Sequence, residues 1–257
     1  MTQSSFGGLM AVVVWAGALV CMEDRLETLA PKPSAPSAAL GLLLLVTGLW
    51  RGTSIAYMDS ASYVLAVWLG LGLALLCVPI RQLARFASEL AVLALLPGCL
   101  LFVKLMPERF LSEGTAGLTT MVLNLLGTPA RWDGRLVALE GGAVNVAGVC
   151  NGVDLMAQVS VVAVIFLLAF RIRSPWRILG LLLIAPVIAV VSNTLRIAFL
   201  AVINASDWAY KMRFFDFFHE EYGGYLFAGL AVLAFGWIYL RVLERDLAAR
   251  RLQRSAA

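Results

Sequence analysis

The stretch from residue 178 to residue 200 reads ILGLLLIAPVIAVVSNTLRIAFL and contains one charged side chain, that of Arg196. A helix of about 20 apolar residues is long enough to cross the hydrocarbon core of a bilayer. Three arginines lie just before the stretch, in Arg171-Ile-Arg-Ser-Pro-Trp-Arg177. Basic flanks of this kind are typical of the cytoplasmic ends of membrane spans, so the stretch predicts a membrane helix.

The composition extends this interpretation to the whole chain. Of its 257 residues 61% are hydrophobic and 14% are charged, and the mean hydropathy is +0.88. Typical soluble domains are about 45–50% apolar and about 25% charged, so this composition indicates a membrane protein. The net charge of +4 does not indicate nucleic-acid binding, because the basic residues lie beside apolar runs. Four cysteines without a CxxC pair, together with a single histidine, predict neither a disulfide framework nor a metal site, and no cofactor is expected.

Seven apolar runs predict an all-α polytopic membrane protein. The predicted spans are 6–22, 38–57, 61–80, 87–105, 152–170, 178–200 and 223–243. The first run has no basic segment before it, which favours a retained span over a cleaved signal peptide. We expect a single integral-membrane domain over 1–257. It has N-terminal spans in 1–105, an outer-face segment in 106–150, catalytic spans in 151–243 and a cytoplasmic tail in 244–257.

The distribution of arginines predicts the orientation of the spans in the cell membrane. The 171–177 loop, the pair Arg81 and Arg85, and the tail with its five arginines should all be cytoplasmic. Segment 106–150 then begins and ends outside. Its apolar part, 110–127, therefore cannot cross fully, and we expect an interfacial or re-entrant helix there. The alternation in 130–146, with a Glu140-Gly-Gly turn, predicts a small extracytoplasmic hairpin.

Three polar groups fall at corresponding ends of the last three spans. Cys150 comes just before the span at 152–170, Arg196 lies about one turn from the end of 178–200, and His219 comes just before 223–243. Because successive helices cross in opposite directions, these three ends face the same side. The sequence therefore predicts that a thiol, a guanidinium and an imidazole meet at the outer surface, as in a cysteine nucleophile with its base and an oxyanion stabiliser.

Each group also has a structural interpretation. Most membrane cysteines are small buried apolar residues, which is how Cys21, Cys77 and Cys99 are interpreted. Cys150 differs because it precedes a helix, where the macrodipole favours a thiolate, and because the amides of Asn151 and Gly152 can donate to an oxyanion.

Arg196 and His219 have structural alternatives as well. An arginine in a span costs about 2.5–3.5 kcal/mol, so Arg196 should have a function unless it extends to the interface, with Asn193 packing against a helix. His219 lies among aromatic residues typical of a membrane interface, yet it is the one side chain suited to act as a general base near neutral pH. Glu220 or Glu221 can orient its ring.

The same motifs resemble those of the exosortase/archaeosortase family of polytopic membrane transpeptidases. That family has a Cys-x-Gly at the head of one span, an Asn-x-x-Arg near the end of the next and a His-x-x-x-Gly before the third. Here they read Cys150-Asn-Gly152, Asn193-Thr-Leu-Arg196 and His219-Glu-Glu-Tyr-Gly223. The resemblance is clear over 110–243. The family usually reads Ala-Cys-Ser-Gly where this chain has Val149-Cys150-Asn151-Gly152, and Gly142-Ala-Val-Asn-Val is similar to the cyanobacterial exosortase branch.

The resemblance implies a substrate class and a reaction. Substrates would be exported proteins with a C-terminal sorting signal, which comprises a Pro-Glu-Pro-like motif, a transmembrane helix and a basic cytoplasmic end. The cysteine would cleave near the motif through an acyl-enzyme and transfer the protein to a surface acceptor. Catalysis would rest on Cys150, Arg196 and His219, supported by Asn193, Asn151, Gly152 and Gly223. The expected partners are these substrates and membrane lipids, without nucleic acid, and no oligomeric state follows from the motifs.

Two other classes of function remain open on the sequence. In a small-solute transporter, Arg196 and Asn193 would line a pathway near the midplane of the bilayer. In a non-catalytic membrane subunit, Cys150 and His219 would have no chemical role. The gathering of polar groups at one surface, and the absence of an evident inverted repeat, favour the enzyme.

Overall fold

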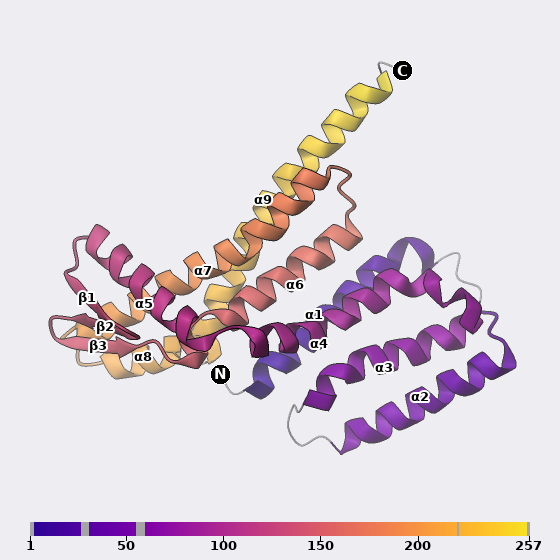
Figure 1. Cartoon of the computed structure of the whole chain (residues 1–257), viewed down its shortest axis with the longest axis horizontal. Helices are drawn as coiled ribbons and strands as arrows, with labels where there is room; N and C mark the ends of the chain where they lie inside the picture. Colours follow the sequence, from indigo (N-terminus) through magenta and orange to yellow (C-terminus); the bar gives the residue numbers. More distant parts are fainter. Residues whose placement is uncertain (1–2, 27–30, 55–59, 220, 256–257) are drawn as a thin grey trace. The chain divides into compact units, whose positions relative to one another are not determined.

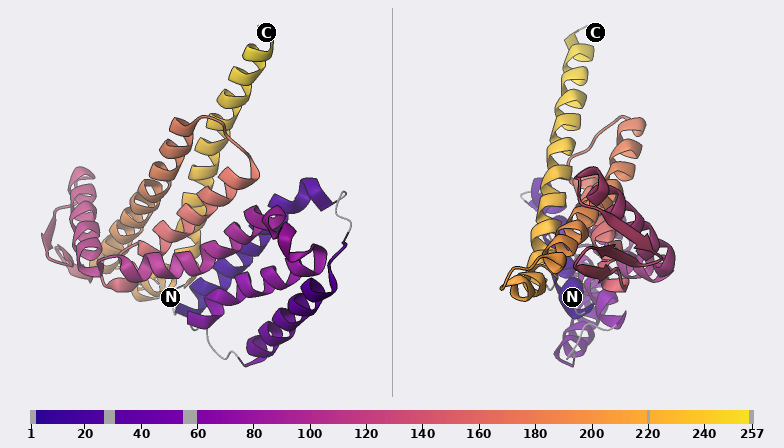
Figure 2. Two further views of the ribbon diagram at one scale, coloured as in Figure 1. Left: turned by 45° about the vertical axis from the view of Figure 1, so that its right-hand side comes forward. Right: turned by 90° about the vertical axis from the view of Figure 1, so that its left-hand side faces the viewer.

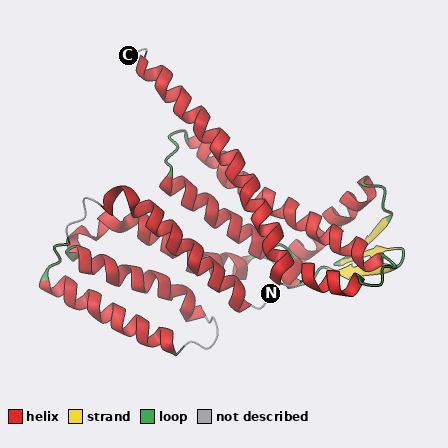
Figure 3. Cartoon of the chain, turned by 180° about the vertical axis from the view of Figure 1, so that it is seen from behind, coloured by secondary structure: helices red, strands yellow, loops and turns green. Residues whose placement is uncertain are grey.

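The structure is a computed structural model and describes residues 3–26, 31–54, 60–219 and 221–255. Helices make up most of it, and its strands form one small sheet (Figure 3). The chain packs as two units. The N-terminal unit contains the residues up to 104 together with 164–171, and the C-terminal unit contains 105–163 and 172–257.

The N-terminal unit is a set of apolar helices joined by short connections (Figure 1). It contains α1 (Gln3–Leu26), α2 (Ala35–Thr53), α3 (Ser60–Cys77), the 3-10 helix η1 (Ile80–Phe86) and α4 (Ala87–Leu105). Helices α2 and α3 approach closely where both carry glycine, since a Cβ on Gly41 would lie 2.8 Å from the carbonyl oxygen of Gly72. Small residues at such contacts are the usual basis of helix packing in membranes.

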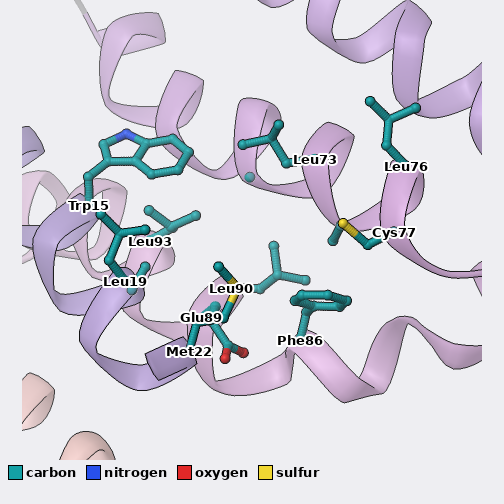
Figure 4. A pocket seen from close by; sticks show the side chains of 13 residues that line it. Trp15, Leu19, Met22, Leu73, Leu76, Cys77, Phe86, Glu89, Leu90 and Leu93 are labelled. Carbon is teal, nitrogen blue, oxygen red and sulfur yellow. The ribbon is translucent and has the colours of Figure 1, made fainter. Parts of the chain in front are cut away.

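A pocket of about 280 Å³ lies between α1, α3, η1 and α4 (Figure 4). Apolar side chains such as Trp15, Leu73 and Phe86 line it, and the carboxylate of the buried Glu89 is the charged group among them. A solute pathway in a transporter needs several convergent polar groups, and this pocket does not supply them.

The C-terminal unit holds all three predicted catalytic residues. Its elements are α5 (Glu108–Leu125), the strands β1 (Ala130–Asp133), β2 (Leu136–Leu139) and β3 (Gly142–Asn145), the 3-10 turn η2 (Gly148–Cys150), α6 (Val153–Ala169), α7 (Pro175–Ala205), α8 (Lys211–His219) and α9 (Glu221–Ser255). The last turns of α6 belong to the N-terminal unit. Helices α7 and α9 run side by side, and α5, the sheet and α8 gather at the end where α7 stops (Figures 1 and 2).

The opposite end of α7 is tied to the late turns of α9. Arg177 Nη1 lies 2.8 Å from Asp246 Oδ1, and Asp246 also pairs with Arg250. The side chain of Asp246 is only 6% exposed, so these cations compensate a carboxylate that is largely removed from water. Arg177 and Arg250 therefore share one end of the C-terminal unit, which agrees with the common side of the membrane predicted for the two segments that carry them.

The segment predicted as a hairpin is a three-stranded antiparallel sheet in the order β1-β2-β3. Both connections are two-residue turns, because Asp133 pairs with Leu136 and Leu139 pairs with Gly142. Gly134 and Gly141 adopt φ of +56° and +97°, which such turns favour. The second turn was predicted from Glu140-Gly-Gly. The first has its own signal in Asp133-Gly134, which the prediction missed.

Five helices are long and apolar enough to cross a membrane among the described residues: Ala35–Thr53, Ser60–Cys77, Ile80–Leu105, Pro175–Ala205 and Gly223–Arg251. The apolar parts of α1 and α6, at Gly7–Glu23 and Val153–Ala169, are shorter. The all-α membrane class is therefore confirmed, and five of the seven predicted spans reach full length. Helix α5 forms where the interfacial or re-entrant helix was expected, and its depth in the membrane stays a prediction.

Two helices extend beyond the apolar runs from which their spans were predicted. Helix α7 begins at Pro175 and ends at Ala205, beyond both limits of 178–200, and α9 continues to Ser255 through the segment predicted as a tail. Proline is well suited to the first turn of a helix, because no intrahelical partner is lost there. Polar residues beyond the apolar run can also stay helical, since the backbone bonds are internal to the helix. Arg51 falls in the last turn of α2, so it marks the end of that span.

Candidate active site

The nucleophile and base predicted from the sequence meet in the structure. Cys150 Sγ lies 3.4 Å from His219 Nε2, although the two residues are 69 positions apart. Cys150 is only 2% exposed and packs in an apolar cluster with residues of α5, the sheet and α7. A thiol in contact with an imidazole is the arrangement in which a cysteine can lose its proton to a neighbouring base.

The local setting of Cys150 differs from the predicted helix start. Cys150 ends the 3-10 turn η2, its N–H donates to the carbonyl of Ala147 at 2.8 Å, and α6 begins only at Val153. Burial raises the pKa of the Cys150 thiol, and the charge of Arg196 lowers that pKa by less. A thiol whose pKa is raised depends on a neighbouring base to form its thiolate.

Gly152 and Asn193 fit together directly behind the nucleophile. Gly152 adopts φ +86°, and a Cβ at this position would lie 2.8 Å from Asn193 Nδ2. A side chain at Gly152 would thus be strained and would collide with the asparagine. Asn193 Nδ2 donates to the carbonyl oxygen of Cys150 at 2.9 Å. Both motif residues therefore hold the backbone that carries the nucleophile.

Asn151 also stabilises this backbone. Its side-chain Oδ1 accepts the N–H of Val153 at 3.0 Å, which satisfies one of the free amides at the start of α6. Its own N–H makes a long contact of 3.5 Å to the carbonyl of Gly148. The Asn151 amide is thus already engaged, if weakly, and Gly152 is the freer of the two amides considered as oxyanion donors.

Arg196 holds the end of the helix that carries the base. Its Nε donates to the carbonyl of Phe218 at 3.2 Å, and its Nη2 donates to the carbonyl of His219 at 2.8 Å. The last carbonyls of a helix have no intrahelical partner, so the guanidinium acts as a cap for α8. Arg196 lies nine residues before the end of α7, because α7 continues beyond the predicted span 178–200.

Helix α8 lies between the predicted spans 178–200 and 223–243, where no helix was predicted. The ring of His219 stacks on the ring of Phe215, with centroids 5.3 Å apart and planes 12° from parallel. This contact and the Arg196 cap restrain both the ring and the backbone of the base. Glu220, expected to orient the imidazole, lies outside the described residues, as does the side chain of Glu221.

Gly223 permits the tight joint between α8 and α9. A Cβ at this position would lie 2.2 Å from the Cα of Phe218 and 2.7 Å from its carbonyl oxygen. These are backbone atoms that no rotamer change can move away. The glycine of the His-x-x-x-Gly motif is therefore required for the chain to fold back beside the residue that Arg196 caps.

One contact to the nucleophile loop was not foreseen. Thr115, on α5, donates its hydroxyl to the carbonyl of Asn151 at 3.0 Å, in a buried setting. A small cavity of about 30 Å³ adjoins the site, and Gly152, Gln158, Asn193 and Arg196 are among its lining residues. The relative polarity of 110–127 was the only signal in the sequence that α5 carries hydrogen-bonding groups.

Comparison with known proteins decides the family. The model of the transmembrane exosortases matches residues 2–236. The chain belongs to the transmembrane exosortase family. Neither the curated proteins nor the solved structures that were compared gave a match. The match extends the resemblance from 110–243 to nearly the whole exosortase chain, including the N-terminal spans, and it makes this a multi-pass membrane protein of the exosortase type.

Proposed function

We propose that this exosortase is a membrane cysteine transpeptidase whose nucleophile is Cys150 and whose base is His219. The observation that carries the proposal is the 3.4 Å contact between Cys150 Sγ and His219 Nε2. Family membership supports a membrane transpeptidase. The buried thiol of Cys150, in contact with the imidazole of His219, supports covalent catalysis as its mechanism.

Acylation begins when His219 Nε2 takes the thiol proton and Cys150 Sγ bonds to the carbonyl carbon of the scissile peptide. The carbonyl oxygen becomes an oxyanion, which the amide of Gly152 and the positive charge of Arg196 stabilise. The tetrahedral intermediate collapses by breaking the C–N bond. His219 then gives its proton to the leaving amine, and the thioester remains.

Transfer reverses these roles. An acceptor nucleophile loses its proton to His219 and attacks the thioester carbon, and the C–S bond breaks. Sγ leaves as a thiolate and recovers the proton from His219. Water in place of the acceptor gives hydrolysis.

The proposed substrates are exported proteins with a C-terminal sorting signal, consisting of a short Pro-Glu-Pro-like motif, a membrane helix and a basic end. A substrate helix that packs along the bundle would present its outer end to a site on the extracytoplasmic face. Binding of this helix would orient the scissile bond before the reaction, which supplies a large part of the rate enhancement in bimolecular reactions.

The experiment is tail cleavage in membranes, followed on a co-expressed exported protein that carries such a signal. Cys150→Ala should abolish cleavage while the enzyme stays in the membrane. Cys99→Ala is the matched control, because Cys99 is also buried, at 4% exposure, and lies in α4 of the N-terminal unit. Cleavage at the parent rate by the Cys150 variant would exclude covalent catalysis at this residue.

A further inference from the structure

Two successive carbonyl groups of the nucleophile loop are held by side chains from different helices. Asn193 on α7 donates to the carbonyl of Cys150 at 2.9 Å. Thr115 on α5 donates to the carbonyl of Asn151 at 3.0 Å. Both side chains are buried, with Asn193 2% exposed and Thr115 7% exposed, so water does not compete for these bonds.

A fixed carbonyl also fixes the amide that follows it. The peptide unit is planar and trans, so its C=O and N–H point in opposite directions. The described chain contains no cis peptide bond. Thr115 therefore sets the direction of the Gly152 N–H through the carbonyl of Asn151.

The N–H of Gly152 differs from the neighbouring backbone N–H groups of the loop, which all make contacts with acceptors. The N–H of Cys150 donates to Ala147, that of Asn151 makes its long contact to Gly148, and that of Val153 donates to Asn151 Oδ1. Within the described part of the chain, no hydrogen bond involves the N–H of Gly152. An amide that is held in place yet unpaired, two residues after a nucleophile, is suited to a charge that appears only during the reaction.

Thr115 differs in this respect from the neighbouring hydroxyl groups on the same helix. Ser112 and Thr119 are fully buried on α5, three positions before and four positions after Thr115, and neither hydroxyl has a hydrogen-bond partner among the residues that the structure describes. Residues at these spacings share a helix face. Thr115 is thus the one of the three whose hydroxyl reaches the nucleophile loop, and the other two provide matched controls.

We propose that Thr115 is a positioning residue, which orients the Asn151–Gly152 peptide so that the Gly152 N–H serves as an oxyanion donor. The inference rests on the proposed function, because the oxyanion arises only if Cys150 attacks a carbonyl. It gives α5 a role in catalysis. This helix fixes one wall of the oxyanion site without contacting the substrate.

The expected fall in the rate of tail cleavage follows from the contribution that one oxyanion donor makes to the rate. Removal of one oxyanion donor typically lowers the rate by about 10²–10³. Loss of the Thr115 hydroxyl does not remove the Gly152 N–H. It only removes the hydrogen bond that holds this N–H in one orientation. Thr115→Val, which preserves the shape of the side chain, should therefore lower kcat for tail cleavage by about 10- to 100-fold and change KM little.

The test compares Thr115→Val with Thr115→Ser and with the control Thr119→Val, in full-length enzyme in membranes. Two rates are measured: tail cleavage, and alkylation of Cys150 by iodoacetamide with Cys21, Cys77 and Cys99 replaced by alanine. Alkylation requires the thiolate but forms no oxyanion. Thr115→Val should lose cleavage while alkylating at the parent rate, and Thr115→Ser should recover most of the cleavage.

Three results would overturn the proposal: unchanged cleavage by Thr115→Val, a parallel fall in both of its rates, or an equal loss in Thr119→Val. Failure of the proposed function gives a different result. In that case Cys150→Ala would still cleave the tail, whatever the behaviour of the Thr115 variants.

Discussion

Arg196 is the residue whose position changes the interpretation of the site most. Two of its N–H groups are already bonded to the carbonyls of Phe218 and His219. Arg196 is therefore part of the support of the base as well as a positive charge near the thiol. The two hydrogen bonds compensate part of the cost of inserting an arginine in a span, which is about 2.5–3.5 kcal/mol.

Arg196→Lys should be nearly as damaging as Arg196→Ala. A lysine ammonium cannot reproduce the planar fork that reaches two carbonyl oxygens at once. Both variants should lose about 10²-fold or more in the rate of tail cleavage, because His219 is no longer fixed and a cation near the oxyanion is lost or displaced. Parent-like cleavage by the lysine variant would show that charge alone is sufficient.

His219→Ala should behave differently with pH. Loss of a general base costs about 10²–10⁴ in rate. Without the imidazole, thiolate forms only by direct ionisation, and the pKa of Cys150 is raised by burial. The remaining cleavage should therefore increase as the pH rises, and it should do so above about pH 8.5, the usual pKa of a cysteine.

The comparison is tail cleavage in membranes at several pH values for His219→Ala and Arg196→Ala. Only the cleavage rate of His219→Ala should increase at alkaline pH, because Arg196→Ala retains the imidazole of His219. Alkaline rescue of the arginine variant, or full activity of the histidine variant, would reverse the two roles.

Candidate site residues can be predicted from the sequence when their side chains are chemically unusual in their surroundings, and not when only the fold brings them to the site. Cys150, Arg196 and His219 were predictable because each is chemically unusual beside an apolar run, and alternation of helix direction put them on one side. The meeting of the thiol and the imidazole is confirmed, and Arg196 donates to the carbonyl of His219, while the catalytic roles of the three residues stay predictions. Thr115 was not predictable, because a threonine in a polar helix is unremarkable until the fold brings it to a backbone carbonyl 36 residues away.

At the scale of elements, α8 links the base to two spans. It follows α7, precedes α9, and exposes the aromatic side chains of Phe214 and Phe217. Its amphipathic pattern covers only nine residues, which is too short for periodicity to distinguish it from an aromatic interfacial loop. The first turn of the sheet, in contrast, was recognisable from its Asp-Gly pair.

Gly223→Ala should disrupt the joint between α8 and α9. The added Cβ would collide with the backbone of Phe218, so the end of α8 must shift away from Arg196. A misplacement of about 1 Å can cost about 10² in rate, and tail cleavage should fall by at least that order.

Gly229→Ala in the same helix is the control, because a Cβ there has open space around it. It should retain cleavage and membrane levels like those of the parent. Equal losses in the two variants would mean that α9 tolerates no alanine, and the joint would not explain the motif glycine.

For the whole molecule, the distribution of charge sets the predicted topology. Arg177, at the start of α7, and Arg250, in α9, share one end of the C-terminal unit, where both pair with Asp246. Cys150 and His219 lie near the other end, where α7 stops and α9 begins. The positive-inside rule then predicts that the arginines are cytoplasmic and the active site extracytoplasmic.

Single cysteines in a variant without the four native ones test this topology. Ser174→Cys should react with a membrane-impermeant thiol reagent only after the membrane is opened, and Asp133→Cys should react in intact cells. Native Cys150 is not used as the topology probe, because it is 2% exposed and a bulky membrane-impermeant reagent reaches it less readily than the small iodoacetamide does. Labelling of residue 174 from outside would place the active site in the cytoplasm and contradict the proposed substrate class.

The separation of Cys150 and His219 by 69 residues has a consequence for biosynthesis. The thiol leaves the ribosome long before its imidazole partner. A half-made chain in the membrane therefore carries the thiol without the imidazole. On the proposed chemistry, the enzyme gains its full activity only when the segment with His219 has been made and has folded against Cys150.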